Sequence, residues 1–202
     1  AKKYCTVNVA ASSEADKFGI IPPFESWSLN SDAAYVHYTP NETIGGVEFH
    51  WIPDVGVIPL VGDFSSTILS RPIDVGRFGL IYAGSQKNIG PAGITLVIVR
   101  DDLIGNSLSI IPSVFDYAQQ AEADSMLNTP PTYTLYLAGL VFKWVKEQGG
   151  LPAMAEMNER KANKLYAVID NSSFYSNPVG KAFRSWMNVP FILANEDLDK
   201  EF

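Results

Sequence analysis

The sequence predicts an α/β fold with a mainly parallel sheet flanked by helices. Three short, mostly apolar runs, residues 57–62, 77–83 and 94–99, have the length of strands and the composition of strands that are buried on both faces. Two later segments, residues 132–148 and 152–170, repeat apolar residues at helical spacing. Strands of the first kind combined with helices of the second kind are typical of an α/β domain.

The chain is long enough and apolar enough to fold around a sizeable core. Its 202 residues suffice for one large domain or for a domain and a half. Hydrophobic residues make up 47% and charged residues 18%, a composition that excludes a disordered chain. The formal net charge of -7 argues against a nucleic-acid partner, which requires a basic surface.

The cysteine and the histidines exclude several kinds of site. Cys5 is the only cysteine, so the chain has no internal disulfide, and no acid or base in its neighbourhood would activate it as a nucleophile. His37 and His50 lack the spacing of metal ligands, so we expect no metal and a structural role for both. No apolar run reaches membrane-spanning length, and Ala1–Tyr4 is not followed by a secretory segment. These features predict a cytoplasmic protein that binds no membrane.

The first part of the chain contains two strand signals. Residues 2–24 are polar and show no clear period. Residues 33–38 predict a strand, and residues 40–43 the loop that follows it. After a turn made by two glycines, residues 47–49 predict a further short strand.

The middle of the chain holds the three apolar runs and their connections. The first run, 57–62, leads directly into Asp63. Residues 67–76, which connect it to the second run, contain a proline and an aspartate and predict a turn and a short helix. Beyond the third run, residues 100–103 begin a surface connection. Residues 109–129 have no clean period, which predicts a loop with one helical turn.

The last part of the chain predicts two amphipathic helices. In residues 132–148 the side chains expected to face the core are Tyr133, Tyr136, Leu137, Leu140, Val141, Trp144 and Val145. In residues 152–170 they are Met154, Met157, Leu165, Val168 and Ile169. Two prolines precede the first helix and Gly149-Gly150 end it. This glycine pair predicts a boundary between a domain of residues 1–148 and a second domain of residues 149–202. Residues 185–191 predict a final strand.

One lysine stands out because of its position between two predicted strands. Lys87 lies in a loop whose neighbours Gly84, Gly90, Pro91 and Gly93 all break regular structure. A lysine held this close to the core is partly desolvated, which favours the neutral, nucleophilic amine. The alternative is a lysine at a strand end whose amine simply reaches solvent.

An acidic residue accompanies this lysine at the end of the preceding strand. Asp63 directly follows a run that predicts a buried strand, and the next strand leads to Lys87. Pyridoxal 5′-phosphate requires a lysine for its aldehyde and an acid for its ring nitrogen. The pair therefore suits this cofactor. By itself, Asp63 could equally cap the turn that Ser65 and Ser66 begin.

Several motifs resemble those of phosphoserine aminotransferases, a family of fold-type-I, pyridoxal-phosphate-dependent transferases. They are Asn41-Glu42-Thr43-Ile44, Asp63-Phe64-Ser65-Ser66, Tyr82-Ala83-Gly84-Ser85-Gln86-Lys87-Asn88-Ile89-Gly90-Pro91-Ala92-Gly93, Asn128-Thr129-Pro130-Pro131, Ile169-Asp170-Asn171-Ser172 and Met187-Asn188-Val189-Pro190-Phe191. The resemblance covers essentially the whole chain. It implies that residues 1–148 are the later part of the large cofactor-binding domain and residues 149–202 the beginning of the small α/β domain. The chain then resembles an internal fragment.

The resemblance also implies an activity and roles for individual residues. The family transfers an amino group between L-glutamate and 3-phosphohydroxypyruvate, giving phosphoserine and 2-oxoglutarate in serine biosynthesis, and acts on a related intermediate of vitamin B6 synthesis. By this resemblance Lys87 binds the cofactor, Thr43 bonds its phenolic oxygen and Gln86 its phosphate. Asn128 and Thr129 would reach the cofactor of the neighbouring subunit in a homodimer. Without the resemblance, Thr43 is an ordinary turn residue, Gln86 a surface residue, and Asn128 and Thr129 belong to an ordinary loop before a helix.

Two alternatives follow from departures from the family pattern. Ser85 stands where the family usually has alanine, and Gly-Ser-Gln-Lys is common in the related alanine–glyoxylate aminotransferases. The motifs on either side favour the phosphoserine branch. In addition, the chain resembles a family member without its glycine-rich phosphate loop and its substrate-binding arginines. A piece that folds and dimerises without catalysing the reaction is therefore the second hypothesis.

Overall fold

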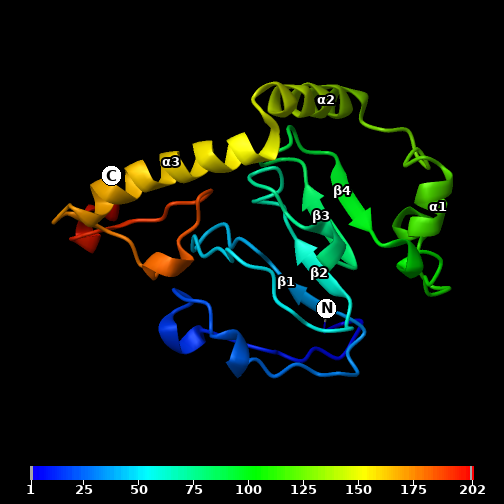
Figure 1. Cartoon of the computed structure of the whole chain (residues 1–202), viewed down its shortest axis with the longest axis horizontal. Coiled ribbons are helices and arrows are strands. Elements are labelled where there is room, and N and C mark those ends of the chain that lie inside the picture. The colour runs from blue at the N-terminus through cyan, green and yellow to red at the C-terminus, as the bar shows by residue number, and fades with distance from the viewer. Residues whose placement is uncertain (1, 201) are drawn as a thin grey trace.

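The computed structural model describes residues 2–200 and 202, and its centre is a four-stranded sheet (Figure 1). The strands are β1 (Val36–Tyr38), β2 (Leu60–Asp63), β3 (Leu80–Gly84) and β4 (Thr95–Val99), in that spatial order. β1, β2 and β3 are parallel, and β4 runs antiparallel to β3. The mainly parallel sheet predicted from the sequence is confirmed.

The strands begin later than the apolar runs that predict them. The ladder between β1 and β2 starts at a proline, where Val36 N donates to Pro59 O at 2.9 Å. Proline has no amide hydrogen, so β2 begins only after it. A 3-10 helix, η3 (Val75–Arg77), occupies the approach to β3, and the Asp74 carboxylate caps it by accepting from Gly76 N. Local capping thus shortens these strands.

The core lies against one face of the sheet only. Ile81 and Ala83 are fully buried, and Leu60 and Tyr38 on the neighbouring strands are nearly so. The alternate residues of β2 and β3 are half-buried. The expectation that the strands are buried on both faces is therefore wrong. On the core face itself, burial decreases toward β4, where Ile98, the register partner of Ile81, is 38% exposed. β4 is at the edge of the sheet, where one side lacks a neighbouring strand.

Two long helices, α2 (Thr132–Glu147) and α3 (Gly150–Asp170), confirm the helical periods of the sequence. Figure 1 shows them meeting at a sharp bend above the sheet. Gly149 and Gly150 form this bend with φ of 100° and 76°, a backbone conformation that favours glycine. The shorter elements are α1 (Tyr117–Glu122), β5 (Tyr175–Ser176) and β6 (Ile192–Leu193), with 3-10 helices η1 (Glu14–Asp16), η2 (Phe24–Ser26), η4 (Asp101–Leu103), η5 (Ser113–Phe115), η6 (Lys181–Phe183) and η7 (Glu196–Lys200). The division into two domains at this bend stays a prediction.

The buried side of α2 matches the predicted one only in part. Val145 is buried as expected, but so are Thr134 and Ala138, whereas Tyr133, Tyr136, Leu140 and Trp144 are exposed. The reason is that α2 packs closely on the loop after β3. Thr134 Oγ1 donates to Ala92 O at 3.0 Å, and a Cβ added at Gly90 would lie 3.7 Å from Ala138 N. Small side chains allow this approach, and bulky ones are directed away.

The buried side of α3 agrees with the prediction only in part. Met154 and Ile169 are buried as expected, but Leu165 and Val168 are 46% and 60% exposed. The inward positions between them are taken by Asn158, Ala162 and Tyr166. Polar side chains therefore occupy a face that the apolar period assigns to the core.

The strand predicted at residues 185–191 is wrong. Ser185 Oγ accepts hydrogen bonds from Met187 N and Asn188 N at 2.9 and 3.0 Å, which makes a tight turn in place of an extended segment. The strand forms just beyond, as β6, which pairs with β5. The strand predicted at 47–49 is reduced to isolated bridges from Val47 and Glu48.

A buried carboxylate joins three distant segments. Glu48 is 1% exposed; its Oε1 lies 3.0 Å from Arg71 Nη1 and accepts from Thr67 Oγ1 at 3.3 Å. Its Oε2 accepts from Trp186 N at 2.8 Å. The loop after β1, the turn after β2 and the C-terminal segment are thus tied to one charge. Within the described residues, no helix is long and apolar enough to cross a membrane.

The edge position of β4 predicts unequal costs for two isoleucines on the same face of the sheet. Ile81 and Ile98 are register partners on β3 and β4, so both lie on the core face, but Ile81 is fully buried and Ile98 is 38% exposed. We expect Ile81→Ala to lower the free energy of unfolding by about 3 kcal/mol through the cavity that it leaves. Ile98→Ala, the matched control, should cost about 1 kcal/mol. Urea denaturation measures both, and equal losses would contradict a core that is centred on β3 and ends at the edge strand.

Candidate active site

Three loops come together at one edge of the sheet because β1, β2 and β3 are parallel. Their carboxyl ends lead to the segments that carry Thr43, Asp63 and Lys87 (Figure 1). In open sheets of this kind, ligands bind outside the carboxyl ends of the strands. The topology therefore brings together the residues that the sequence singles out as a pair, and adds the predicted threonine.

Lys87 contacts Thr43 directly. Its Nζ donates to Thr43 Oγ1 at 2.7 Å, across 44 residues of sequence. Lys87 is exposed, so the expectation that its amine is held in a desolvated environment is wrong for this chain. What holds the amine in place is the threonine hydroxyl.

The backbone of the lysine loop is closed from within by Ser85. This residue is fully buried; its Oγ donates to Pro91 O and accepts from Ile94 N at 3.4 Å. The backbone adds two bonds, from Ser85 N to Ile94 O and from Gly90 N to Ser85 O. The hydroxyl that distinguishes this chain from the family pattern therefore has two partners inside the loop. Its role is to fix the loop on which Lys87 sits.

The structure tests one of the two roles that the sequence left open for Asp63. Its Oδ1 accepts from Ser65 N at 2.9 Å, so it does cap the following turn. It is only half-buried, and its remaining carboxylate edge faces Tyr82 on β3. Burial and then the Asp63 carboxylate raise the pKa of Tyr82, which also shares a hydrogen bond with Asp63. Capping and a second interaction are thus compatible.

His37 belongs to the same cluster, which the sequence analysis did not foresee. His37 Nε2 lies 3.0 Å from Tyr82 Oη. Burial lowers the pKa of His37, and the Asp63 carboxylate opposes this shift. Since Tyr82 bonds to Asp63, the three side chains form a row on the half-open face of the sheet. The alternation of side chains along a strand could have predicted this cluster, because His37, Asp63 and Tyr82 lie on the same face of the sheet in the parallel register.

The other predicted cofactor residues, Gln86, Asn128 and Thr129, are exposed at the surface. Gln86 is exposed and folds over the end of β3, so closely that a Cβ on Gly84 would lie 2.5 Å from Gln86 Oε1. Asn128 and Thr129 are both exposed. They precede Pro131, which packs 3.7 Å from the Cβ position of Gly93 at the far end of the lysine loop. No hydrogen bond within the described residues joins either one to Lys87, Asp63 or Thr43.

A buried polar network supports the loop that carries Thr43. Asn41 is fully buried, and its Nδ2 donates to Ser66 Oγ at 2.9 Å and to Asn188 Oδ1 at 2.7 Å. Ser66 Oγ donates in turn to Asn41 O at 2.9 Å. Among the described residues, Asn41 Oδ1 is a buried side-chain oxygen without a hydrogen-bond partner. This network ties the threonine loop to the turn after Asp63.

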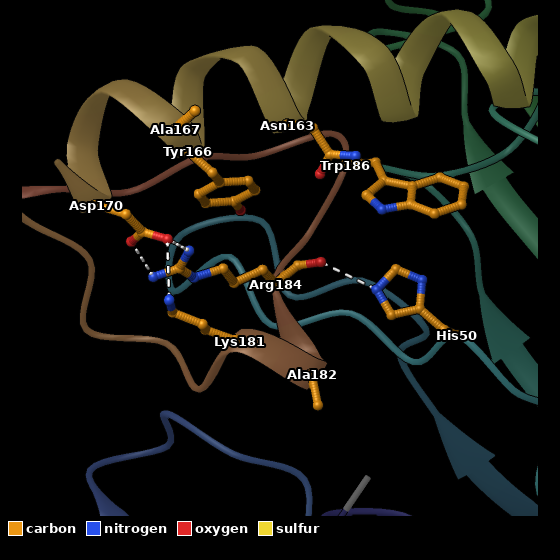
Figure 2. A pocket seen from close by; sticks show the side chains of 9 residues that line it. All are labelled: His50, Asn163, Tyr166, Ala167, Asp170, Lys181, Ala182, Arg184 and Trp186. Carbon is orange, nitrogen blue, oxygen red and sulfur yellow. Dashed lines mark hydrogen bonds and ion pairs between the residues drawn. The ribbon is translucent and has the colours of Figure 1, made fainter.

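A separate cavity of about 460 Å³ lies beside the C-terminal end of α3 (Figure 2). Arg184 makes two 2.8 Å hydrogen bonds to the Asp170 carboxylate and lies against the ring of Tyr166. These bonds from Arg184 lower the pKa of Asp170 to about 2. Lys181 is 3.4 Å from the same carboxylate. The charges here satisfy one another, which makes this cavity a structural ion-pair site. In the described part of the chain, no group of acidic, histidine or cysteine side chains could hold a metal ion.

Comparison with known proteins identifies the family of this chain. The family model "Aminotransferase class-V" matches residues 1–202. A curated phosphoserine aminotransferase of Hahella chejuensis is 60% identical over 202 residues, which is 100% of this chain and 56% of that protein. The chain thus spans about half the length of the curated relatives that it matches.

Solved structures agree with this comparison. The phosphoserine aminotransferase from Bacillus circulans subsp. alkalophilus superimposes with a TM-score of 0.96 at 46% identity, over 99% of this chain and 56% of that one. The phosphoserine aminotransferase from Trichomonas vaginalis, solved with pyridoxal phosphate bound, gives 0.90 at 42% identity, over 96% of this chain and 55% of that one. The fold-type-I architecture expected from the sequence is confirmed.

The closed lysine loop predicts a specific cost for losing the Ser85 hydroxyl. Ser85→Ala leaves Pro91 O without this donor and Ile94 N without this acceptor, and we expect it to lower the free energy of unfolding by about 1–3 kcal/mol. Thr95→Ala, at an exposed position of β4 beside the loop, is the control and should change it by less than about 0.5 kcal/mol. Chemical denaturation tests both. If Ser85→Ala is as mild as the control, the hydroxyl does not close the loop.

Proposed function

Because this chain belongs to the class-V aminotransferase family, we propose that it is the cofactor-binding part of a pyridoxal-phosphate-dependent aminotransferase in which Lys87 holds the cofactor. The observation that carries the proposal is the contact of Lys87 Nζ with Thr43 Oγ1 at 2.7 Å. It brings the predicted cofactor lysine and the predicted cofactor threonine together from loops that are 44 residues apart. Asp63 ends the strand between them.

The groups at this edge of the sheet fit pyridoxal phosphate in kind. The cofactor presents an aldehyde, a phenolic oxygen, a ring nitrogen and a phosphate, and these require an amine, a donor, an acid and polar partners. Lys87, Thr43, Asp63 and Gln86 supply one of each at the ends of neighbouring strands. When bound, the cofactor supplies a ring that accepts the electrons of the carbon from which a proton is removed.

Each residue of the chain then has a definite task. Lys87 Nζ would hold the cofactor through its aldehyde, and this amine would also be the group that takes up and returns a proton. Asp63 would keep the ring nitrogen protonated, since a carboxylate stabilises the adjacent positive charge. The Thr43 hydroxyl, which bonds the lysine amine in this structure, would bond the phenolic oxygen.

Subunit contacts belong to the same proposal. Asn128 and Thr129 are exposed and have no hydrogen bond to the described cofactor residues, so they are available for the cofactor phosphate of a second copy. The exposed aromatic residues Tyr133, Tyr136 and Trp144 follow them on α2 and offer apolar area to such a copy. We therefore retain the homodimer in which these two residues complete the neighbouring site.

The substrates are proposed from the names of the relatives. The curated relative from Hahella chejuensis, 60% identical to this chain, is a phosphoserine aminotransferase. It supports glutamate and 3-phosphohydroxypyruvate over the substrates of alanine–glyoxylate aminotransferases, with serine and vitamin B6 biosynthesis as the settings and the cytoplasm as the location. Since the chain spans 56% of that relative, a piece without activity of its own is the second candidate. Turnover of the 202-residue chain, measured beside the full-length natural protein, separates the two.

The proposal predicts that Lys87 forms the covalent link to the cofactor. Borohydride reduction of the full-length natural protein in the presence of pyridoxal phosphate should place the label on Lys87, because its amine is held at the site by Thr43. Peptide mapping by mass spectrometry gives the position. Lys181, which is paired with Asp170, serves as the internal control and should stay unlabelled. A label on another lysine would overturn the assignment.

A second prediction separates the charge of Asp63 from its capping role. Asp63→Asn keeps an oxygen that can accept from Ser65 N but removes the negative charge. We expect the variant to retain the cofactor but to have a lower turnover number. The loss of transition-state stabilisation should be about 2–4 kcal/mol, which is typical of removing one positioned electrostatic group. Steady-state kinetics and the visible absorbance of bound cofactor measure the two effects. Normal turnover in a variant that folds and retains cofactor would contradict the pairing.

A further inference from the structure

The turn that follows Asp63 contains a strained residue. Leu69 has φ of 64°, a left-handed conformation that leucine rarely adopts. The turn begins with helix-like bonds from Thr67 N and Ile68 N to Phe64 O, at 2.9 and 2.8 Å. A backbone strain of this kind persists only where surrounding contacts hold it, and it occurs preferentially at functional sites. The contacts that hold Leu69 are therefore informative.

Two asparagine side chains bond the backbone carbonyls of the residues on either side of Leu69. Asn88 Nδ2 donates to Ile68 O at 2.7 Å, and Asn158 Nδ2 donates to Ser70 O at 3.0 Å. Asn88 directly follows Lys87 in the lysine loop. Asn158 is on α3, 88 residues away from Ser70, and is 8% exposed. Each amide thus comes from an element that the sequence does not place near this turn.

We propose that Asn158 is a positioning residue that, through the strained turn at Leu69 and through Asn88, makes the placement of Lys87 depend on α3. The path consists of three consecutive links: α3 to Ser70, the left-handed Leu69 to Ile68, and Asn88 to the lysine loop. Its consequence for catalysis rests on the proposed function. The mechanical coupling itself depends only on these contacts.

A merely structural role explains Asn158 less well. It occupies a buried position of α3, while Leu165 and Val168 of the same helix are exposed. An amide at such a position is costly unless it is hydrogen-bonded, and packing alone would be served better by an apolar side chain. Asn158 bonds a carbonyl of the turn, not one of its own helix. The buried amide is therefore explained by the turn that it holds.

Other contacts hold the residues of the turn that lie before and after Leu69. A displacement of α3 is therefore not taken up by movement of these residues. Thr67 Oγ1 lies 2.8 Å from Ser70 Oγ and bonds the buried Glu48 carboxylate. Glu48 is paired in turn with Arg71, the residue after Ser70. Leu69 is therefore the strained residue between two held segments of the turn, and the two asparagines bond the residues on either side of it.

The test measures the chemical reactivity of Lys87 in the full-length natural protein, freed of cofactor. Competitive acylation with acetic anhydride, followed by mass spectrometry, gives the rate at Lys87 relative to Lys181. Asn158→Leu should change this ratio by about three- to tenfold, since coupling through a contact chain has this size. Asn163→Leu, on an exposed position of the same helix, is the matched control and should leave the ratio unchanged. No change with Asn158→Leu would overturn the proposal.

A cycle of variants tests the path. If Asn158 acts through Asn88, Asn88→Leu with Asn158→Leu should change the ratio no more than Asn88→Leu alone, because residues on one path are not additive. In a Leu69→Gly background, where the left-handed backbone needs no support, the effect of the Asn158 variant should disappear. Additive effects, or a full effect in Leu69→Gly, would contradict the path. If Asn158→Leu does not fold, the smaller change Asn158→Ser takes its place in both comparisons.

The readout also keeps this proposal apart from the proposed function. Acylation requires no cofactor and no turnover, so a coupled Lys87 that fails to bind pyridoxal phosphate would overturn only the function. If Lys87 binds the cofactor but its acylation rate does not change with Asn158→Leu, only the coupling is overturned. The kinetics of a folded Asn158 variant give a further sign: a displaced lysine should lower kcat more than it changes KM for glutamate.

Discussion

The carboxylate of Glu48 is buried away from water and needs hydrogen-bond and ion-pair partners. The arrangement of the loops around the candidate site depends on the residues that supply these partners. Removing one partner from a buried ion pair costs about 3–5 kcal/mol, because the remaining charge is left unpaired. Here the partners are Arg71, Thr67 and the amide of Trp186, at 3.0, 3.3 and 2.8 Å. They come from the turn after β2 and from the C-terminal segment. These segments therefore have to meet at Glu48, which closely follows the loop of Asn41 and Thr43 in the sequence.

The site combines a rigid base with an exposed reactive group. Asn41, Ser85 and Glu48 are buried and hydrogen-bonded, and they fix the three loops from below. The amine of Lys87 projects from this base into solvent, held by one hydroxyl. Such an arrangement lets the amine leave and return without rearranging the backbone that carries it. A covalent carrier of a cofactor requires this combination.

The fold was largely predictable because its signals are local. The length of an apolar run marked β2, β3 and β4, and the helical period marked α2 and α3. The placement of Asp63 and Lys87 at the same edge of the sheet followed from the parallel order of β2 and β3. Local signals could not show which distant segment packs against each side of a helix or strand. α2 turns Thr134 and Ala138 inward because the loop after β3 packs closely against it, and Ala92 of that loop lies 42 residues before Thr134. The same holds for His37, which meets Asp63 only through Tyr82 of another strand, and for the exposure of Lys87.

The bond between Glu48 and Trp186 spans 138 residues of sequence, which has a consequence for synthesis of the chain. At about 5–20 residues per second, a ribosome needs on the order of ten seconds to produce that interval. During this time the carboxylate has no amide from residue 186 and stays hydrated, so the loop around it cannot settle into its final place. The sheet can pair early, since its strands follow one another closely, but the candidate site cannot mature before the last turn emerges. A nascent chain stalled ahead of residue 186 should therefore hold a formed sheet with an open, protease-sensitive edge.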